Sequence, residues 1–410
     1  MLTVEQALST IVAKVRPFEP ASTALADSFG LILAADAHSD VDSPPFDKSL
    51  MDGFAVRVCD LGASRVGLEV IEEVTAGRVP TRRLQPGQAT QIMTGAPLPE
   101  GADAVVPVEQ TEFDAGRVTL RGDAPPLGTG ANIMRQATSM KRGDVVVAAG
   151  RQLRAQELGA LAESGQHQVF VRRRPRAALL ATGDELVSIA EVPAAGQIRN
   201  SNETMLVSQI QQAGAEPVPL GIARDNRADL SEKIRAGLKG DLLLLSGGVS
   251  AGKLDLVPSE LEAAGVSQVF HKVQVKPGKP LWFGVLDRQQ QPSADDRCYV
   301  FGLPGNPVSA MVCFELFVRT AISRLLGREP AQPQGVRARL TQEHIARGGR
   351  PTYHPARLEW TEAGPVVSLV RWHGSSDLQA TVDANAMALI GPQETAYRTG
   401  DELLVFPWDA

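Results

Sequence analysis

The sequence is poor in the residues that build disulfides, structural zinc sites or histidine-ligated metal centres. Its 410 residues include 3 cysteines, which are far apart and form no CxxC pair. Structural zinc is therefore not expected, and such sparse cysteine is typical of a reducing compartment. The 6 histidines are dispersed, without HxH or HExxH spacing. This pattern argues against a catalytic metal held by histidine.

Long apolar runs and an excess of positive charge are also missing. The most apolar helix-like segment, 308–318, is interrupted by Glu315, so no membrane span is expected. The N-terminus lacks a basic-then-apolar stretch, which argues against a signal peptide. The formal net charge of −6 gives no bulk attraction to nucleic acid or anionic lipid. The sequence therefore predicts a cytoplasmic protein that binds neither nucleic acid nor membranes.

The pattern of apolar, Pro and Gly residues changes several times along the chain, which indicates more than one domain. A capping box at Thr3 and Gln6 begins an amphipathic helix, and from about residue 36 to 130 short apolar runs alternate with Pro and Gly. From residue 177 the pattern becomes alternating strands and helices, which predicts a mainly parallel sheet covered on both faces. After a linker with two prolines at 328–335, residues 336–410 predict a small β-barrel or sandwich.

Polar and glycine-rich segments follow several of the predicted parallel strands. In open parallel sheets, ligands bind beyond the carboxyl ends of the strands. The expected strand 177–181 runs into TGDE, 242–245 runs into SGGVS, and 298–301 runs into GLPGNP; KPGKP joins the intervening strand pair. We therefore expect these segments to meet at one edge of the sheet.

The residue types in these segments are suited to binding a phosphoanhydride that is bridged by a metal ion. Gly247 and Gly248 allow backbone amides to approach a phosphate, and the helix after Asn306 adds the partial positive charge of its N-terminus. Lys276 and Lys279 are compact point charges for phosphate or another oxyanion. The hard oxygen ligands that Mg²⁺ prefers are supplied by Glu185, Asp225 and Asp255. Each motif alone is more often a cap or a turn, so the prediction depends on their joint placement.

In these segments the chain resembles the MoeA family, which includes the E domain of gephyrin. The resemblance covers nearly the whole length. Its marks are SPPFDKSLMDGFAV at 43–56, MTGAPLPEGADAVVP at 93–107, ATGDEL at 181–186, LSGGVSAGKLD at 245–255, KPGKP at 276–280 and GLPGNPVS at 302–309.

The resemblance implies a multi-domain α/β protein. Its expected parts are a helical and linker domain of residues 1–45 and 136–175, a β-rich domain of 46–135, a mainly parallel α/β domain of the molybdopterin-binding type at 176–327, and a C-terminal β-barrel at 328–410. The implied activity is that of a molybdopterin molybdenumtransferase, which inserts molybdate into adenylylated molybdopterin and releases AMP with the help of Mg²⁺. The implied assembly is a homodimer, supplied with substrate by an upstream molybdopterin adenylyltransferase.

The family's site residues carry over by motif. Asp52 and Thr94 would face the cleft from the partner subunit, and the metal ligands would be Asp225, Asp255 and Glu185. Lys276 and Lys279 would act on the oxyanion or the pterin phosphate. Substrate would also contact Ser246, Gly247, Gly248, Ser250, Pro304, Asn306, Pro307, Ser309 and Ser375.

The chain departs from the family pattern at three places. Ala137-Thr138-Ser139 stands where Gly-Glu-Asp is common, Lys48 replaces a usual Asn, and a family arginine falls at Pro355, for which Arg357 is a candidate substitute. Two alternatives stay open at this point: a molybdopterin adenylyltransferase, and a non-catalytic scaffold that binds the cofactor. The sequence also leaves open whether molybdate or tungstate is used, and which proteins accept the product.

Overall fold

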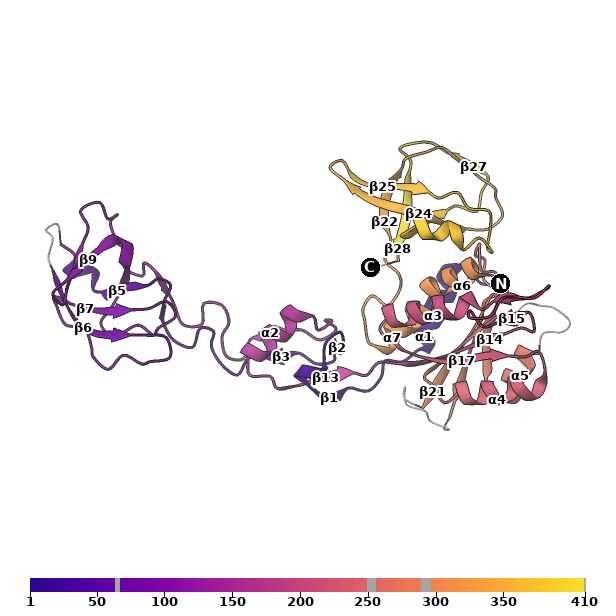
Figure 1. Cartoon of the computed structure of the whole chain (residues 1–410), viewed down its shortest axis with the longest axis horizontal. Coiled ribbons are helices and arrows are strands. Elements are labelled where there is room, and N and C mark those ends of the chain that lie inside the picture. The colour runs from indigo at the N-terminus through magenta and orange to yellow at the C-terminus, as the bar shows by residue number, and fades with distance from the viewer. Residues whose placement is uncertain (63–66, 249–255, 289–295, 409–410) are drawn as a thin grey trace. The chain divides into compact units, whose positions relative to one another are not determined.

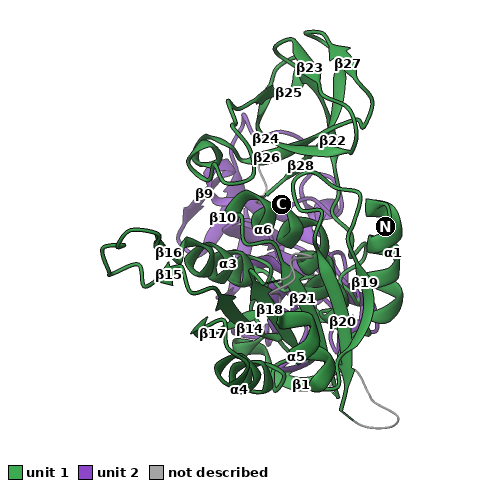
Figure 2. Cartoon of the chain, turned by 90° about the vertical axis from the view of Figure 1, so that its right-hand side faces the viewer, with its two compact units in different colours: residues 1–35, 149–154, 170–410 green, residues 36–148, 155–169 purple. Residues whose placement is uncertain are grey.

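A computed structural model describes residues 1–62, 67–248, 256–288 and 296–408. The chain forms two compact units (Figure 2). Unit 1 contains residues 1–35, 149–154 and 170–410, and unit 2 contains residues 36–148 and 155–169. Within the described ranges, no helix is long and apolar enough to cross a membrane.

Unit 1 is built on a six-stranded sheet, of which Figure 1 labels β14, β17 and β21. Its order, which can be followed in Figure 2, is β17 (Glu216–Ala223), β14 (Arg176–Thr182), β18 (Leu242–Ser246), β21 (Arg297–Leu303), β20 (Trp282–Asp287) and β19 (Ser267–His271). The first four strands are parallel, and β20 and β19 form an antiparallel edge. The predicted mainly parallel sheet is confirmed.

Alternate residues of the central strands serve two separate cores. Leu242 and Leu244 of β18 pack with α1 (Val4–Lys14), α3 (Ser201–Gln212), α6 (Pro307–Cys313) and α7 (Arg319–Leu325). Leu243 and Leu245 pack with α4 (Arg227–Gly237) and α5 (Val257–Ala263) on the other face. Successive strand side chains point to opposite faces, so a strand buried on both sides must be apolar throughout, as LLLL is.

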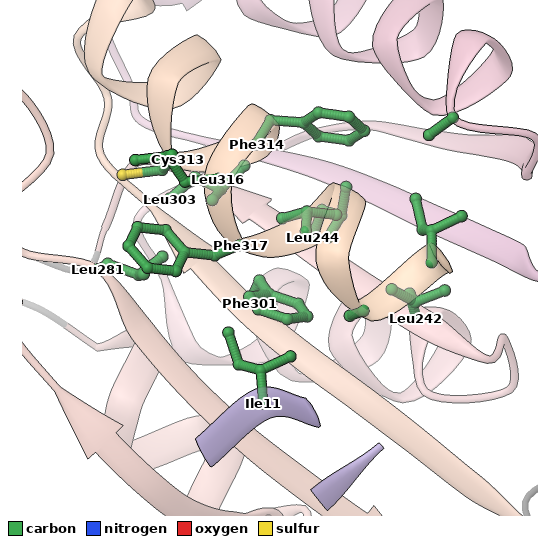
Figure 3. Packing of buried hydrophobic residues seen from close by; sticks show 14 of the residues in the cluster. Ile11, Leu242, Leu244, Leu281, Phe301, Leu303, Cys313, Phe314, Leu316 and Phe317 are labelled. Atoms are coloured by element: carbon green, nitrogen blue, oxygen red, sulfur yellow. The ribbon is translucent and has the colours of Figure 1, made fainter. Parts of the chain in front are cut away.

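The larger core lies between the sheet and α6 to α7 (Figure 3). Phe314, Phe317 and Phe301 are fully buried in it, and Ile11 reaches it from α1. A π-helical turn, Phe314–Val318, separates α6 from α7. It carries Glu315, which is 4% exposed and accepts hydrogen bonds from Arg319 and from Gln209 of α3. The one charge in this apolar stretch is thus paired.

The C-terminal part of unit 1 is a closed barrel, as expected. Its strands run in the order β22 (Val336–Leu340), β25 (Gly364–Leu369), β24 (Thr352–Thr361), β26 (Ala386–Ile390) and β28 (Glu402–Pro407). Beside it, β23 (His344–Ala346) pairs with β27 (Thr395–Tyr397). Unit 1 also holds β15 (Leu186–Val187) paired with β16 (Ile198–Arg199), and a small sheet of β1 (Ala21–Ala24), β13 (Gln168–Arg172) and β2 (Ile32–Leu33).

Unit 2 is β-rich and contains one α-helix, α2 (Ala155–Glu163), within its described residues. Its six-stranded sheet has the order β8 (Ala104–Pro107), β5 (Gly53–Val56), β7 (Gln88–Ile92), β6 (Leu68–Val74), β10 (Arg117–Leu120) and β9 (Thr111–Asp114). Two short ladders join β11 (Ile133–Met134) to β4 (Lys48–Ser49) and β12 (Val145–Val147) to β3 (Ala37–His38). The boundaries of the four domains stay a prediction.

Candidate functional site: two adjoining pockets

The carboxyl ends of the parallel strands lie side by side, as the motif spacing predicts. Thr182 at the end of β14 is in register with Ala223 of β17, and Ser246 at the end of β18 is in register with Leu303 of β21. Trp282, at the start of antiparallel β20, pairs with Gly302. The KPGKP segment just before β20 therefore lies at the same edge as the ends of the parallel strands.

A cavity of about 570 Å³ opens at these ends, and we call it the strand-end pocket. It brings together eight of the predicted site residues: Glu185, Asp225, Ser246, Gly247, Gly248, Pro304, Asn306 and Pro307. Ser250 and Asp255 lie outside the described residues. The pocket therefore combines carboxylates with two glycine-containing turns.

The glycines of the first turn are required by close packing. Gly247 and Gly248 have φ values of +94° and +64°, and a Cβ on either would lie 2.7 Å from an atom of Thr182. Larger residues would be both strained and overpacked there. The Gly247 amide, however, donates to the Leu303 carbonyl at 3.1 Å. Contrary to expectation, this amide is therefore engaged within the protein and is not free for a phosphate.

The carboxylates of the strand-end pocket are exposed and differ in their local roles. Glu185 folds back over Gly183, where an added Cβ would lie 2.5 Å from its Oε2 atom. Asp184 accepts a hydrogen bond from the backbone of Asp225 at 3.1 Å, so it fixes the loop that carries Asp225. Glu185 and Asp225 are thus held at the pocket wall, and Asp184 acts as a turn residue.

A second cavity of about 770 Å³ adjoins the first, and we call it the basic pocket. It is lined by the predicted residues Lys276, Lys279, Ser309 and Ser375, and it shares Pro280, Pro304 and Asn306 with the strand-end pocket. The structure therefore divides the predicted acids and lysines between two pockets with common walls.

The basic pocket concentrates positive charge. Besides its lysines it is lined by Arg347 and Arg350, and no Asp or Glu is among its lining residues. Arg350 donates to the Val275 carbonyl at 2.8 Å, which holds its guanidinium beside the KPGKP segment. Four formal cations without a lining carboxylate make the basic pocket electrostatically suited to an anion of more than one charge.

The KPGKP segment is fixed from two sides. The Lys276 amide donates to Pro351 O at 2.9 Å, and the Tyr353 amide donates to Lys276 O at 2.8 Å, which couples the segment to the start of β24. On the other side Gly278, with φ of +115°, lies against buried Cys313, whose Sγ would be 2.4 Å from an added Cβ. The backbone that carries both lysines is therefore held in place on two sides.

Aromatic and imidazole rings form another wall of the basic pocket. His354 lies between His344 and Trp372 in edge-on contacts, with centroid distances of 5.7 and 5.1 Å. Burial lowers the pKa of His354 to about 4, and nearby Lys276 opposes its protonation further. Its Nδ1 faces the Pro355 carbonyl at 2.8 Å. Because a carbonyl only accepts, Nδ1 carries the proton of a neutral ring.

Ser375 links the barrel to the α/β sheet of unit 1. The side-chain Nδ2 of Asn306 donates to Ser375 Oγ at 2.8 Å, and the backbone amide of Val308 at the start of α6 donates to Ser375 O at 3.0 Å. One of the first N–H groups of this helix is therefore satisfied by the barrel. Asn306 belongs to both pockets, so this contact lies on their common wall.

Asp52 and Thr94 are brought together in unit 2. The backbone amide and the hydroxyl of Thr94 both donate to Asp52 Oδ1 at 2.7 Å. These bonds lower the pKa of Asp52, the backbone bond having the larger effect. The pairing of Gly53 with Ile92 in neighbouring strands positions the two loops. The pair is an exposed, ionised carboxylate in a fixed orientation.

The three departures from the family pattern have distinct surroundings. Ala137 has φ of +58°, a backbone conformation that suits glycine, and Lys48 pairs with Met134 in a short ladder. Pro355 lies within β24. Arg357 makes an exposed ion pair with Glu359 at 3.2 Å and, like Pro355, lines neither pocket, so its role as a substitute arginine stays a prediction.

Apart from Ser375, sequence reasoning missed the C-terminal part's share of the basic pocket. Arg347 and Arg350 flank Gly348-Gly349 in the loop between β23 and β24, whereas His354 lies in β24 and Trp372 follows β25. Their one available signal was the density of cations between residues 347 and 357. That signal does not distinguish Arg350 from Arg357, which lines neither pocket.

Comparison with known families classifies each part of the chain. Residues 2–165 match the MoeA N-terminal region (domain I and II), residues 178–324 match a probable molybdopterin binding domain, and residues 337–408 match the MoeA C-terminal region (domain IV). The α/β part with its two pockets is thus of the molybdopterin-binding class.

Whole-chain relatives identify the family. A molybdopterin molybdenumtransferase of Nostoc sp. is 37% identical over 92% of this chain and 86% of its own length, and one of Staphylococcus epidermidis is 32% identical over 98% and 94%. A solved molybdopterin biosynthesis MoeA protein from Pyrococcus horikoshii covers 100% of both chains at 30% identity with a TM-score of 0.82. The chain belongs to the MoeA family.

Proposed function

We propose that this chain is a molybdopterin molybdenumtransferase, which inserts molybdate into adenylylated molybdopterin and releases AMP. The observation that carries the proposal is the common wall of the two pockets, formed by Pro280, Pro304 and Asn306. A pocket of cations next to a pocket of carboxylates and glycine turns suits two reactants that must meet: a free oxyanion and a phosphoanhydride. The full-length relatives are molybdenumtransferases, which disfavours the adenylyltransferase alternative.

The basic pocket is the proposed site of molybdate. Molybdate is a tetrahedral dianion, and its approach to a phosphoanhydride costs electrostatic energy. Lys276, Lys279 and Arg350 offset that repulsion, since prepositioned charges need no rearrangement when the anion enters. Ser309 and the ring N–H of Trp372 supply neutral donors to the same cavity. The Trp372 ring N–H is buried and has no hydrogen-bond partner within the described structure.

The strand-end pocket is the proposed site of the adenylate and of Mg²⁺. The described residues contain no cluster of three or more His, Cys, Asp or Glu suited to a metal. Magnesium is nevertheless often held by one or two carboxylates together with substrate phosphates. Glu185 and Asp225 fit that requirement, with Asp255 as the third predicted ligand. The ion would neutralise the phosphate charge and stabilise the leaving AMP.

A homodimer with a shared active site is also part of the proposal. Asp52 and Thr94 would contribute to the pockets of the partner subunit, because the Asp52 carboxylate is exposed and is held in place by Thr94. Subunit mixing tests this point. Asp52→Asn and Asp225→Asn would each be inactive alone, and mixed dimers would regain one intact site, so that a 1:1 mixture reaches about a quarter of the wild-type rate. Continued inactivity of a mixture shown to exchange subunits would contradict the shared site.

The reaction itself is tested with purified protein, adenylylated molybdopterin, Mg²⁺ and molybdate. We expect AMP release together with a product that activates a cofactor-free molybdenum enzyme. Consumption of ATP without molybdate would instead indicate an adenylyltransferase, and binding of the pterin without AMP release would indicate a scaffold. A parallel series with tungstate determines the choice of oxyanion.

A further inference from the structure

Asn202 carries a hydrogen-bond acceptor that the protein itself does not satisfy. It lies in the first turn of α3 and lines the strand-end pocket. Its Nδ2 donates to Ser246 Oγ and to Gly305 O, both at 2.8 Å, so it joins the two turns that follow β18 and β21. Its Oδ1 is buried and has no hydrogen-bond partner within the described structure.

The orientation of this amide is determined by its surroundings. Gly305 O is a carbonyl and can only accept, so the atom facing it must be the amide nitrogen. A flipped side chain would set two oxygen lone pairs against each other and leave Ser246 without this donor. Both protons of Nδ2 are used by the two observed bonds. The two turns therefore use the amide nitrogen and leave the acceptor of this pocket-lining residue unused.

The chemistry of the acceptor limits what it binds. An amide oxygen repels a phosphate oxygen, since both carry lone pairs, and it attracts an N–H or O–H group. Thr182 lies in the same pocket with 5% of its surface exposed, and its Oγ1 also has no partner within the described structure. The residues of this pocket thus include a second buried polar atom without a described hydrogen-bond partner. A buried acceptor without a partner is costly, so a ligand that donates to it gains affinity.

We propose that Asn202 is a specificity-determining residue whose amide oxygen accepts a hydrogen bond from a ribose hydroxyl of the adenylate. The inference rests on the proposed function, which assigns the adenylate to the strand-end pocket. Asn202 holds the Ser246-Gly247 turn and the Gly305 turn together, so its amide lies beside two turns that line the strand-end pocket. In a nucleotide the sugar is the group attached directly to the phosphate, which makes its hydroxyls the nearest donors.

The test measures binding of four nucleotides to the full-length protein by calorimetry, with and without Mg²⁺. The ligands are AMP, 2′-deoxy-AMP, 3′-deoxy-AMP and purine riboside 5′-monophosphate, which lacks the amino group of the base. Asn202→Ala removes the acceptor and also the two turn contacts. Thr204→Ala, an exposed position two residues along α3, is the control.

We expect Asn202→Ala to weaken AMP binding about 5- to 100-fold, the range that corresponds to a buried ribose hydroxyl left without its acceptor. For one of the two deoxy nucleotides, the affinities of wild type and Asn202→Ala should differ much less, because that nucleotide already lacks the hydroxyl that donates to Asn202. Thr204→Ala should bind all four ligands as the wild type does. This pattern is specific to the hydroxyl, since a loss of turn contacts alone would weaken every ligand by the same factor.

Three outcomes would overturn the inference while leaving the proposed function intact. If Asn202→Ala weakens all four ligands by the same factor, Asn202 has a structural role. If only purine riboside 5′-monophosphate binds equally well to wild type and variant, Asn202 contacts the base. If the variant loses affinity only in the presence of Mg²⁺, Asn202 acts on the metal. Failure of the wild type to bind AMP at all would instead reject the adenylate site and the inference with it.

Discussion

Replacing Gly278 by alanine should displace the lysines of the basic pocket. The added Cβ would lie 2.4 Å from Cys313 Sγ, whereas ordinary contact begins near 3.4 Å, so the backbone must move by about 1 Å. Its φ of +115° adds strain for any residue with a side chain. Overpacking costs about 1–3 kcal/mol and the backbone strain a similar amount, which gives a local destabilisation of about 2–6 kcal/mol.

The functional consequence follows from the position of Gly278 between Lys276 and Lys279. A shift of about 1 Å in a substrate-positioning group costs up to about 100-fold in rate. We therefore expect Gly278→Ala to raise the KM for molybdate and to lower kcat/KM by one to two orders of magnitude. Steady-state AMP release at varied molybdate measures both quantities, and thermal unfolding followed by circular dichroism measures the stability change.

Two further variants separate the clash from the backbone strain. Gly400→Ala has a comparable φ of +95° with nothing within 4 Å of the added Cβ, so it should keep the wild-type KM. Cys313→Ala combined with Gly278→Ala removes the obstructing sulfur and should recover most of the lost activity. The explanation is refuted if Gly278→Ala leaves the molybdate KM unchanged, or if the double variant is as impaired as the single one.

Three other predictions concern single side chains. Burial lowers the pKa of His354 to about 4 from 6.5, so the folded state binds fewer protons between these values than the unfolded state. The free energy of unfolding should fall by up to about 3 kcal/mol as pH drops through that window, then level off, and denaturant titrations should show a flatter profile for His354→Gln. Ala137→Gly should stabilise unit 2 by up to about 1 kcal/mol, because φ of +58° suits glycine; an unchanged or lower melting temperature would count against this. Arg350→Ala should raise the molybdate KM about 5- to 100-fold, whereas Arg357→Ala, outside the pocket, should leave it unchanged.

The sequence predicted the strand-end pocket well because its signals are local. A run such as LLLL is buried on both faces of a sheet, and the segment after it must lie at the carboxyl edge, so Glu185, Asp225 and Ser246 could be placed together without knowing the fold in detail. The glycines at 247 and 248 added a second local signal. Their requirement for positive φ is met in the structure.

The basic pocket was predicted only in part because half of it is contributed by distant barrel segments. Lys276 and Lys279 have a recognisable motif, but Arg350 joins them through pairing of Lys276 with Thr352, which no spacing in the sequence reveals. The π-helical turn at Phe314–Val318 was also missed, since the pattern from 308 to 326 predicts one continuous helix. The use of the Gly247 amide by Leu303 likewise depends on the register between strands that are far apart in sequence.

The central claim is that two adjoining pockets hold the two reactants of one reaction, and paired variants test it directly. Lys279→Ala should raise the molybdate KM while the Kd for AMP in the presence of Mg²⁺ stays as in the wild type. Asp225→Asn should weaken AMP while molybdate affinity, followed by the fluorescence of Trp372, is retained. Both variants should lower AMP release and cofactor formation together. If either variant keeps full turnover, or if both weaken the same ligand and spare the other, the assignment of the two pockets is contradicted.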